Sequence, residues 1–231
     1  MGILDRFIRN KNKLPEKRRE KNNKYIKKMG IVCCENLPEI QSSDDVKLKD
    51  IDTICKRAIA CLLSIQFVFE IESENNYDEA KKHFSELLKK YDVENKLLRK
   101  EQRLFNNQYN KQDIADIVWN YEAYWSLVWV LGLINDIKVA NNICDCKKAI
   151  ALVEDCSSFE DFKGKCKIRN IEDILDMLDL YYRYHWACVE KRINPNTNIG
   201  NLNGEVVWER RKGLEWVISK EHDWDDISLD T

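Results

Sequence analysis

The stretch 111–137, KQDIADIVWNYEAYWSLVWVLGLINDI, constrains the fold more than any other part of the chain. It holds three Trp and two Tyr, and its apolar residues fall on nearly every side of a helix. A helix that is apolar all round must be covered on most of its sides. The sequence therefore predicts a long central helix with other helices packed around it.

The rest of the chain also favours helix over strand. Only seven Gly and three Pro occur in 231 residues, fewer than the turns of an all-β fold would need. Apolar residues recur at helical spacing, and no stretch alternates as a strand would. We predict an all-α fold with long buried central helices and irregular connections. Further helices are expected over 48–71, 77–91, 94–107, 170–191 and 205–220, with one or two short ones in 147–163.

Positive charge is concentrated at the start of the chain. Residues 1–30 contain eleven Lys and Arg against three Asp and Glu, a net charge of +8, so the total of −2 leaves −10 on residues 31–231. We predict a basic N-terminal arm over 1–30, with a short amphipathic helix in it, and a single helical domain over 31–231. The arm either lies on the acidic body or makes weak contact with an anionic membrane surface. Because few aromatic residues, such as Tyr25, are interleaved with its charges, specific nucleic-acid binding is not expected.

The cysteines and the apolar runs indicate a compartment. Nine Cys occur, an odd number that includes the adjacent pair Cys33 and Cys34. This pattern is typical of reduced intracellular thiols and not of a disulfide framework. The start of the chain has no signal-peptide pattern, and no run approaches the ~20 apolar residues of a membrane span. We therefore expect a cytoplasmic protein.

No metal or cofactor site is predicted. Cys144 and Cys146, with Cys156 and Cys166 further on, lack the paired spacing of a zinc site. The C-terminal letters DWDDISLD have neither the spacing nor the turn glycine of a calcium loop. A glycine-rich phosphate loop and a nucleotide fingerprint are also missing from the sequence. No catalytic residue can therefore be assigned, which leans against an enzyme.

Charged residues occur at positions that should be buried. An isolated buried carboxylate is costly, and a buried Arg needs a carboxylate partner. We predict that five such side chains form one polar network between three helices. They are Glu122, Asp179, Arg183, His185 and Arg210. Such a network either fixes the register of the helices or lines a ligand or catalytic pocket, and the sequence leaves both alternatives open.

The chain closes on EHDWDDISLDT, residues 221–231, in which one Trp lies among five acids. A large apolar ring surrounded by carboxylates has three interpretations. It can be a solvated tail, a metal-binding claw, or a strap that docks on the body of the protein.

Six stretches of the chain carry a resemblance to a known family. They are LPEI, VKLKDIDTICKRAIA, WNYEAYWSLVWVLGLI, IRNIEDILDMLDLYYRYHWA, GEVVWERRKGLEWV and WDDISLDT. With these stretches the chain resembles a bacterial family known only as domain of unknown function 4272. The resemblance covers roughly residues 15–231, and the segment Ala140–Asp145 follows the family's proline-containing loop only loosely.

The resemblance implies a mainly helical domain and no established activity, so no catalytic residues can be transferred. Members of the family tend to end on the same Trp-Asp-Asp pattern, which implies that the C-terminal strap is part of the domain. We therefore expect Trp224 to insert into a groove between helices. The carboxylates of Asp225, Asp226 and Asp230 are expected to cap helix N-termini or to pair with Arg210, Arg211 or Arg183.

Two functions from different classes fit these observations. The first is a non-enzymatic protein-interaction or accessory module, such as a toxin-neutralising partner, which the many Trp and Tyr could anchor. The second is an enzyme or small-ligand-binding protein that uses the predicted polar network. The sequence identifies neither the partner nor the oligomeric state.

Overall fold

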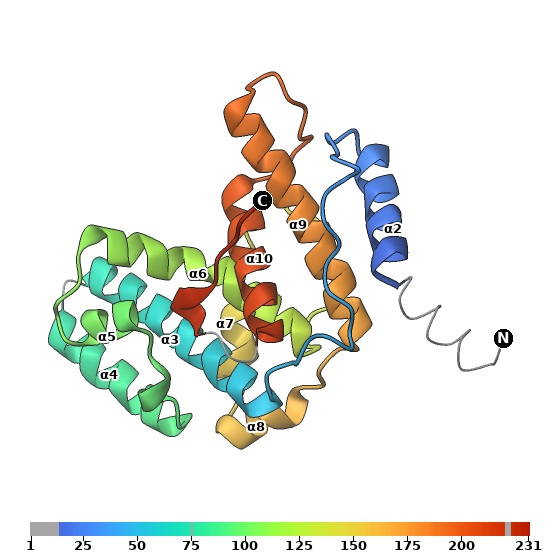
Figure 1. The fold of residues 1–231 in the computed structure, drawn as a ribbon. Coiled ribbons are helices and arrows are strands. Elements are labelled where there is room, and N and C mark those ends of the chain that lie inside the picture. Colours follow the sequence, from blue (N-terminus) through green and yellow to red (C-terminus); the bar gives the residue numbers. More distant parts are fainter. Residues whose placement is uncertain (1–13, 75, 220–222) are drawn as a thin grey trace, which may run out of the picture.

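The computed structural model describes residues 14–74, 76–219 and 223–231. Within these ranges the chain forms nine α-helices and two short 3₁₀ helices. The described part has no sheet, and its one β-bridge joins Lys47 to Ser219. The all-α fold is therefore confirmed (Figure 1).

Four long helices form the centre of the molecule: α3 (Ile51–Glu74), α6 (Lys111–Val130), α9 (Ile171–Ile193) and α10 (Gly204–Ile218). Helix α6 packs against α3 on one side and α10 on the other, and α10 packs against α9. The buried apolar side chains of these helices belong to one continuous hydrophobic cluster. The sequence pattern that predicted α6 as a covered central helix is confirmed, since most of its length is buried.

Helix α6 ends at Val130, earlier than the apolar pattern predicted. Gly132 adopts a φ of +76°, and the Leu133 N–H donates to the Val128 carbonyl, which is the usual left-handed cap of a helix C-terminus. A Cβ at Gly132 would lie 2.6 Å from the carbonyl oxygen of Lys167. The glycine is needed here both for its backbone conformation and for the close passage of another segment.

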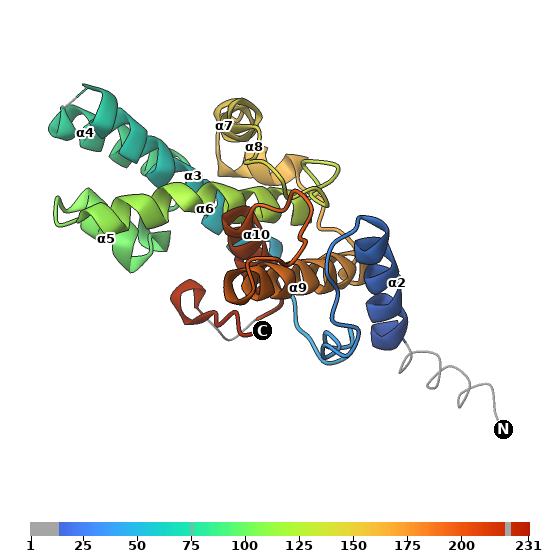
Figure 2. The ribbon, with the colours of Figure 1, turned by 90° about the horizontal axis from the view of Figure 1, so that it is seen from above.

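Shorter helices cover the ends of α3 and α6. Helix α4 (Tyr77–Lys90) is capped by the Asn76 side chain, which accepts from the Glu79 N–H. The two short helices expected in 147–163 are α7 (Cys146–Glu154) and α8 (Phe159–Lys165). Figure 2 shows α4 and α5 (Arg99–Phe105) at one end of the molecule and α2 (Leu14–Lys28) at the other, with α3 and α6 between them.

The helix expected over 94–107 is broken into two pieces. These are η1 (Glu94–Lys96) and α5 (Arg99–Phe105), and the backbone between them is extended. The Glu101 carboxylate accepts a hydrogen bond of 2.7 Å from the Leu98 N–H, so a side chain satisfies the start of α5. That capping bond stabilises the second helix as a separate element.

The N-terminal basic segment and the C-terminal segment both lie against the central helices. Residues 14–28 form α2 (Leu14–Lys28), which packs along α9, while the amphipathic helix predicted at the start of the arm lies outside the described residues. At the other end of the chain, η2 (Trp224–Asp226) lies between α5 and α10 (Figures 1 and 2).

Helices α6 and α10 approach each other closely at small residues. A Cβ at Gly213 of α10 would lie 2.1 Å from Ser126 Oγ and 2.8 Å from the Ala123 carbonyl oxygen of α6. Real Cβ atoms do not approach other atoms so closely, so Gly213 sets the distance between the two helices.

We predict that Gly213→Ala destabilises the protein by about 2–3 kcal/mol, because an added methyl group forces α10 away from α6. Gly164 in α8 provides a matched control, since a Cβ there meets nothing within 4 Å. Gly164→Ala should leave stability unchanged or raise it by up to about 1 kcal/mol. Urea unfolding of both variants measures the effect, and equal stabilities would contradict the close approach.

Candidate functional site

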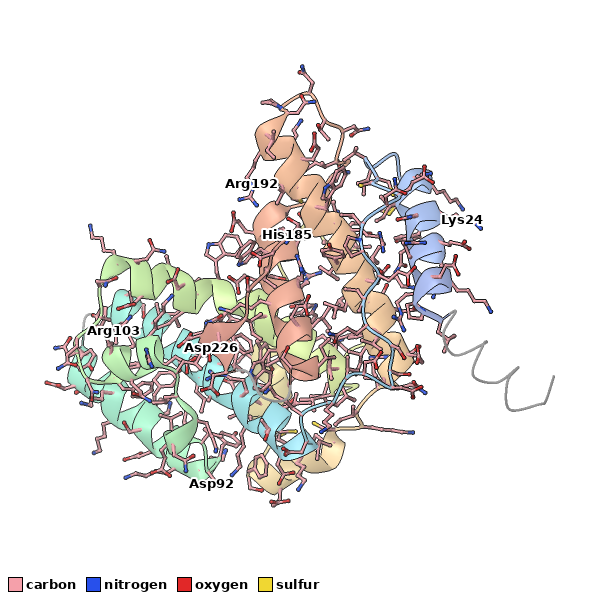
Figure 3. All side chains as sticks on the ribbon, viewed as in Figure 1. Lys24, Asp92, Arg103, His185, Arg192 and Asp226 are labelled. Atoms are coloured by element: carbon pink, nitrogen blue, oxygen red, sulfur yellow. The ribbon has the colours of Figure 1, made fainter. Side chains whose placement is uncertain are left out.

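The five charged residues predicted to form one network lie in three separate groups. Glu122 pairs with Arg210, and Asp179 pairs with Arg183. His185 belongs to a third group, which Figure 3 shows between α9 and α10. No hydrogen bond or ion pair joins the three groups within the described residues, so the prediction of a single network was wrong. Glu122 of α6 faces α10, whereas α9 turns Asp179 toward α2 and His185 toward α10.

The first group is a fully buried ion pair between α6 and α10. Arg210 Nε donates to Glu122 Oε2 at 2.7 Å, and the two side chains are 3% and 1% exposed. The other carboxylate oxygen accepts from the Cys144 N–H at 2.6 Å. Arg210 Nη1 donates to the Tyr181 hydroxyl at 3.2 Å and to the Val139 carbonyl at 2.8 Å. The pair therefore joins α6, α10, α9 and the loop after α6.

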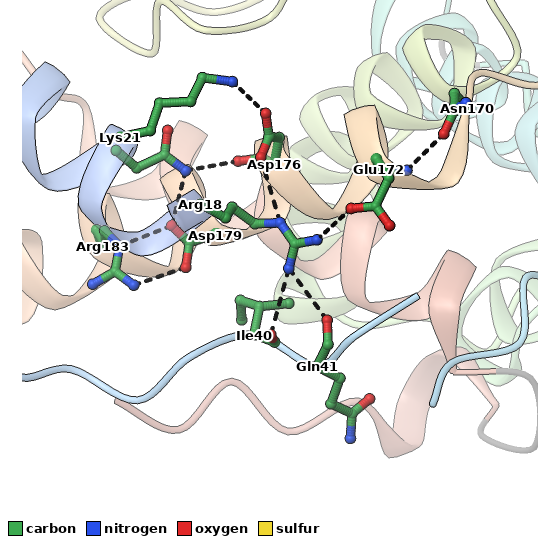
Figure 4. Close-up of polar contacts among 10 residues, drawn as sticks. Arg18, Lys21, Ile40, Gln41, Asn170, Glu172, Asp176, Asp179 and Arg183 are labelled. Atoms are coloured by element: carbon green, nitrogen blue, oxygen red, sulfur yellow. Dashed lines mark hydrogen bonds and ion pairs between the residues drawn. The ribbon is translucent and has the colours of Figure 1, made fainter. Parts of the chain in front are cut away.

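The second group lies between α9 and α2 (Figure 4). Asp179 accepts two hydrogen bonds from Arg183, of 2.9 and 2.7 Å, and both side chains are buried. Asn22 of α2 donates to Asp179 Oδ2 at 2.8 Å. The carboxylate is thus satisfied from its own helix and from the neighbouring one, which leaves it no free oxygen for a ligand.

Further charges of α2 pair with the acidic face of α9. Arg18 contacts Glu172 at 2.7 Å and Asp176 at 3.4 Å, and Lys21 forms an ion pair with Asp176. Arg18 also donates to the Gln41 carbonyl at 3.2 Å, in the segment that crosses α9 (Figure 4). Part of the basic N-terminal segment is therefore neutralised by the protein's own acids.

The third group connects His185 to the C-terminal end of the chain. Arg211 Nη1 lies 2.6 Å from His185 Nδ1, and because Arg can only donate, the imidazole proton is on Nε2. Burial, and then the charge of Arg211, lowers the pKa of His185 to about 4, so the ring is neutral near pH 7. Arg211 Nη2 donates to the Asp230 carbonyl at 3.2 Å, and Nη1 to the Leu229 carbonyl at 3.5 Å.

The C-terminal segment 223–231 packs on the body as a strap. Trp224 is 2% exposed, and its ring meets the Trp216 ring edge-on with the centroids 5.4 Å apart. The Arg57 guanidinium and the Lys212 ammonium lie over the Trp224 ring, at 5.7 and 5.4 Å from its centroid. Trp224 therefore occupies a position between α3 and α10, enclosed by another aromatic ring and two cations.

The acids of the strap do not form the ion pairs with arginine that the sequence analysis predicted. Asp225, Asp226 and Asp230 are exposed, and none of them forms an ion pair within the described residues. Arg211 binds backbone carbonyls of the strap, and its ion pair is with Glu215 of its own helix and not with a strap carboxylate. Arg183 and Arg210 are occupied by Asp179 and Glu122. The strap is therefore held by its tryptophan and its backbone, which leaves its carboxylates available.

Two adjoining cavities lie along the strap, and Leu98, Trp224 and Asp225 line both of them. The larger cavity, of about 640 Å³, is an open groove between the strap, the start of α3 and the η1–α5 segment. The smaller one, of about 180 Å³, lies between α5, α6, α10 and η2. None of the five residues predicted to form a polar pocket lines either cavity.

A buried ion pair that the sequence analysis missed lies next to the groove. Arg57 of α3 pairs with Glu101 of α5, and both side chains are buried. Arg57 Nη1 also donates to the Lys96 carbonyl at 2.9 Å. The burial of Arg57 could have been predicted, because Arg57 lies within the apolar pattern of a helix as Arg210 does. The burial of Glu101 could not, because Glu101 lies in the mostly polar stretch 94–107.

Two polar atoms of the smaller cavity have no partner. Among the described residues, neither Glu209 Oε2 nor Trp224 Nε1 finds a hydrogen bond, although both atoms are buried. Burial raises the pKa of the Glu209 carboxyl to about 7, against the opposing effect of the Lys212 charge. Buried polar groups without partners are rare in proteins and costly, so this cavity is the best candidate for a binding site.

Two other kinds of site are not seen in the ranges that the structure describes. No cluster of His, Cys, Asp and Glu there has the arrangement to hold a metal ion. None of the helices there has the length and apolar character that a membrane crossing requires. All nine cysteines are free thiols, and burial raises the pKa of several, including Cys61 to about 12.

Comparison with known proteins identifies one family. A family model described as Domain of unknown function (DUF4272) matches residues 18–227. No curated protein and no solved structure matches the chain. The matched range includes the beginning of the strap, so Trp224 and the two acids beside it belong to the family's domain.

We predict that deleting residues 223–231 lowers the melting temperature by about 5 °C or more. The deletion exposes the pocket of Trp224 and removes the carbonyls bound by Arg211, a loss of about 2–3 kcal/mol. Calorimetry of the truncated and full-length chains provides the measurement. The double variant Asp225→Asn/Asp226→Asn is the control and should melt as the wild type does. A truncated chain with an unchanged melting temperature would refute the docked strap.

Proposed function

The chain belongs to the DUF4272 family, and we propose that it is a non-enzymatic protein-interaction module that binds an extended segment of a partner protein in the groove along the strap. One observation carries this proposal. The two walls of the groove bear opposite charges that make no ion pairs within the described part of the chain. Lys96 and Arg99 lie on the η1–α5 wall, and Asp225 and Asp226 lie on the strap.

The floor of the groove supports a peptide ligand. Leu97 and Leu98 are partly buried there, and Trp216 and Trp224 are buried beneath. A partner segment with basic and acidic side chains on its two edges and an apolar side chain between them would match both walls and the floor. Charge complementarity of this kind selects the partner and its orientation more than it adds raw affinity.

The buried ion pairs support a structural frame and not a catalytic centre. Both oxygens of Glu122 and both oxygens of Asp179 already accept hydrogen bonds. A general base must lie within reach of a substrate, and both of these carboxylates are buried and line neither cavity. Support for the enzyme alternative through these residues is therefore lacking.

Two finer points belong to the same proposal. Toxin neutralisation is the case in which the bound segment comes from a toxin, and the sequence of the selected segment would identify it. The proposed compartment is the cytoplasm, in keeping with nine free thiols.

A random peptide library displayed on phage tests the groove. We expect the wild-type chain to select peptides that combine acidic, basic and apolar residues. The double variant Lys96→Glu/Arg99→Glu should bind these peptides about tenfold or more weakly, because one wall then repels their acidic edge. Fluorescence anisotropy of labelled peptides gives the dissociation constants.

Lys82→Glu/Lys89→Glu is the matched control. Both lysines are exposed on α4, away from the groove lining, and the change in net charge is comparable. Binding should survive in this variant. Equal loss of binding in the two double variants would mean that net charge alone explains the loss. That result would overturn the groove as the interaction site.

A further inference from the structure

The smaller cavity is a site of its own, set behind the strap. Its walls come from α5, α6, α10 and η2, and Trp224 separates it from the groove. At about 180 Å³ it has room for about six water molecules, or for one small organic molecule. A partner segment lying in the groove would pass over this cavity without filling it.

An acceptor and a donor in this cavity both lack partners. Glu209 Oε2 is buried, and Trp224, at 2% exposed, keeps its Nε1–H without an acceptor among the described residues. Each unpaired buried group costs about 1–3 kcal/mol. A ligand that accepts from Trp224 and donates to Glu209 would recover both costs.

The charged side chains that line the cavity differ in whether they are paired. Two of the acids that line the cavity, Asp116 and Glu101, are already paired, with Lys100 and with Arg57 respectively. The Lys212 ammonium lies over the Trp224 ring and makes no ion pair of its own within the described residues. The cavity is therefore lined by a residue with an unpaired carboxyl oxygen, Glu209, and one with an unpaired indole N–H, Trp224. The charge of the Lys212 ammonium over the Trp224 ring also acts on Glu209.

We propose that this cavity binds a small zwitterion of the α-amino acid class, with its ammonium group on Glu209 and its carboxylate on Trp224 Nε1 and Lys212. A zwitterion matches both unpaired groups at once, whereas a simple amine or a simple carboxylate would leave one of them unpaired. Asn120 also lines the cavity and is nearly buried, so its amide lies close to such a ligand. The site is independent of the groove and of its peptide.

Binding depends on the ionisation of Glu209. Its pKa, raised to about 7 by burial, means that the carboxyl becomes protonated as the pH falls below neutrality. A free amino acid keeps both charges between about pH 4 and pH 7. The charged groups around Glu209 are Lys212 and Glu205 on α10, Asp116 on α6 and Lys100 on α5.

A titration with free amino acids followed by ¹H–¹⁵N NMR tests the proposal. The indole signal of Trp224, assigned with Trp224→Phe, should move on addition of a subset of amino acids, because its N–H gains a charged acceptor. The same ligands with an acetylated amine or an amidated carboxylate should fail to shift it. Affinity for the intact ligands should fall about tenfold between pH 7.5 and pH 5.5, since Glu209 loses its charge.

Variants on α10 separate this site from the groove. Glu209→Gln keeps the shape of the side chain and should weaken binding about tenfold or more, without the pH dependence. Glu205→Gln, an exposed residue of the same helix, should bind as the wild type does. The groove variant Lys96→Glu/Arg99→Glu should also retain amino-acid binding, so failure of one proposal leaves the other testable.

Three results would overturn the proposal. The first is a Trp224 indole signal that no free amino acid moves, which would mean that the cavity holds water only. The second is equal binding of the acetylated or amidated derivatives, which would mean that the site does not recognise both charges of a zwitterion. The third is unchanged affinity in Glu209→Gln.

Discussion

The arrangement of the central helices depends on the buried ion pair between Glu122 and Arg210. Neither charge could lie in the core alone, because an unpaired ion there costs several kcal/mol. Each must therefore meet the other, which places α10 against α6 in one register. The remaining donors of Arg210 bind the Tyr181 hydroxyl and carbonyls of the loop after α6, so the same guanidinium also positions α9 and that loop. The close approach at Gly213 completes the contact between α6 and α10.

The strap follows from the position of α10. Once that helix is placed, Arg211 faces the carbonyls of the C-terminal segment and Trp216 faces Trp224. The strap then closes the groove and the smaller cavity, neither of which exists without it. Buried ion pairs hold the frame, whereas Glu209 Oε2, the Trp224 indole N–H and surface charges without ion pairs among the described residues lie around the strap.

Much of the fold could be predicted from periodicity, and most of the site could not. The all-round apolar pattern of α6 and the caps at Asn76 and Asn170 are local properties, and the structure agrees with them. Sequence spacing shows which face of a helix carries a charge, but not toward which neighbour that face is rotated. For this reason Asp179 and Glu122 were placed in one network although they face different helices. Glu209 was missed because its surroundings come from four separate elements.

A double-mutant cycle on Glu122 and Arg210 tests most directly whether the buried pair is the frame of the fold. Glu122→Gln and Arg210→Met are each expected to cost about 3–5 kcal/mol, because each leaves one buried charge unpaired. In the double variant both charges are gone, so its loss of stability should be much smaller than the sum of the two single losses. Urea unfolding at pH 7 measures all four proteins. Single losses that simply add would contradict a frame built on this pair.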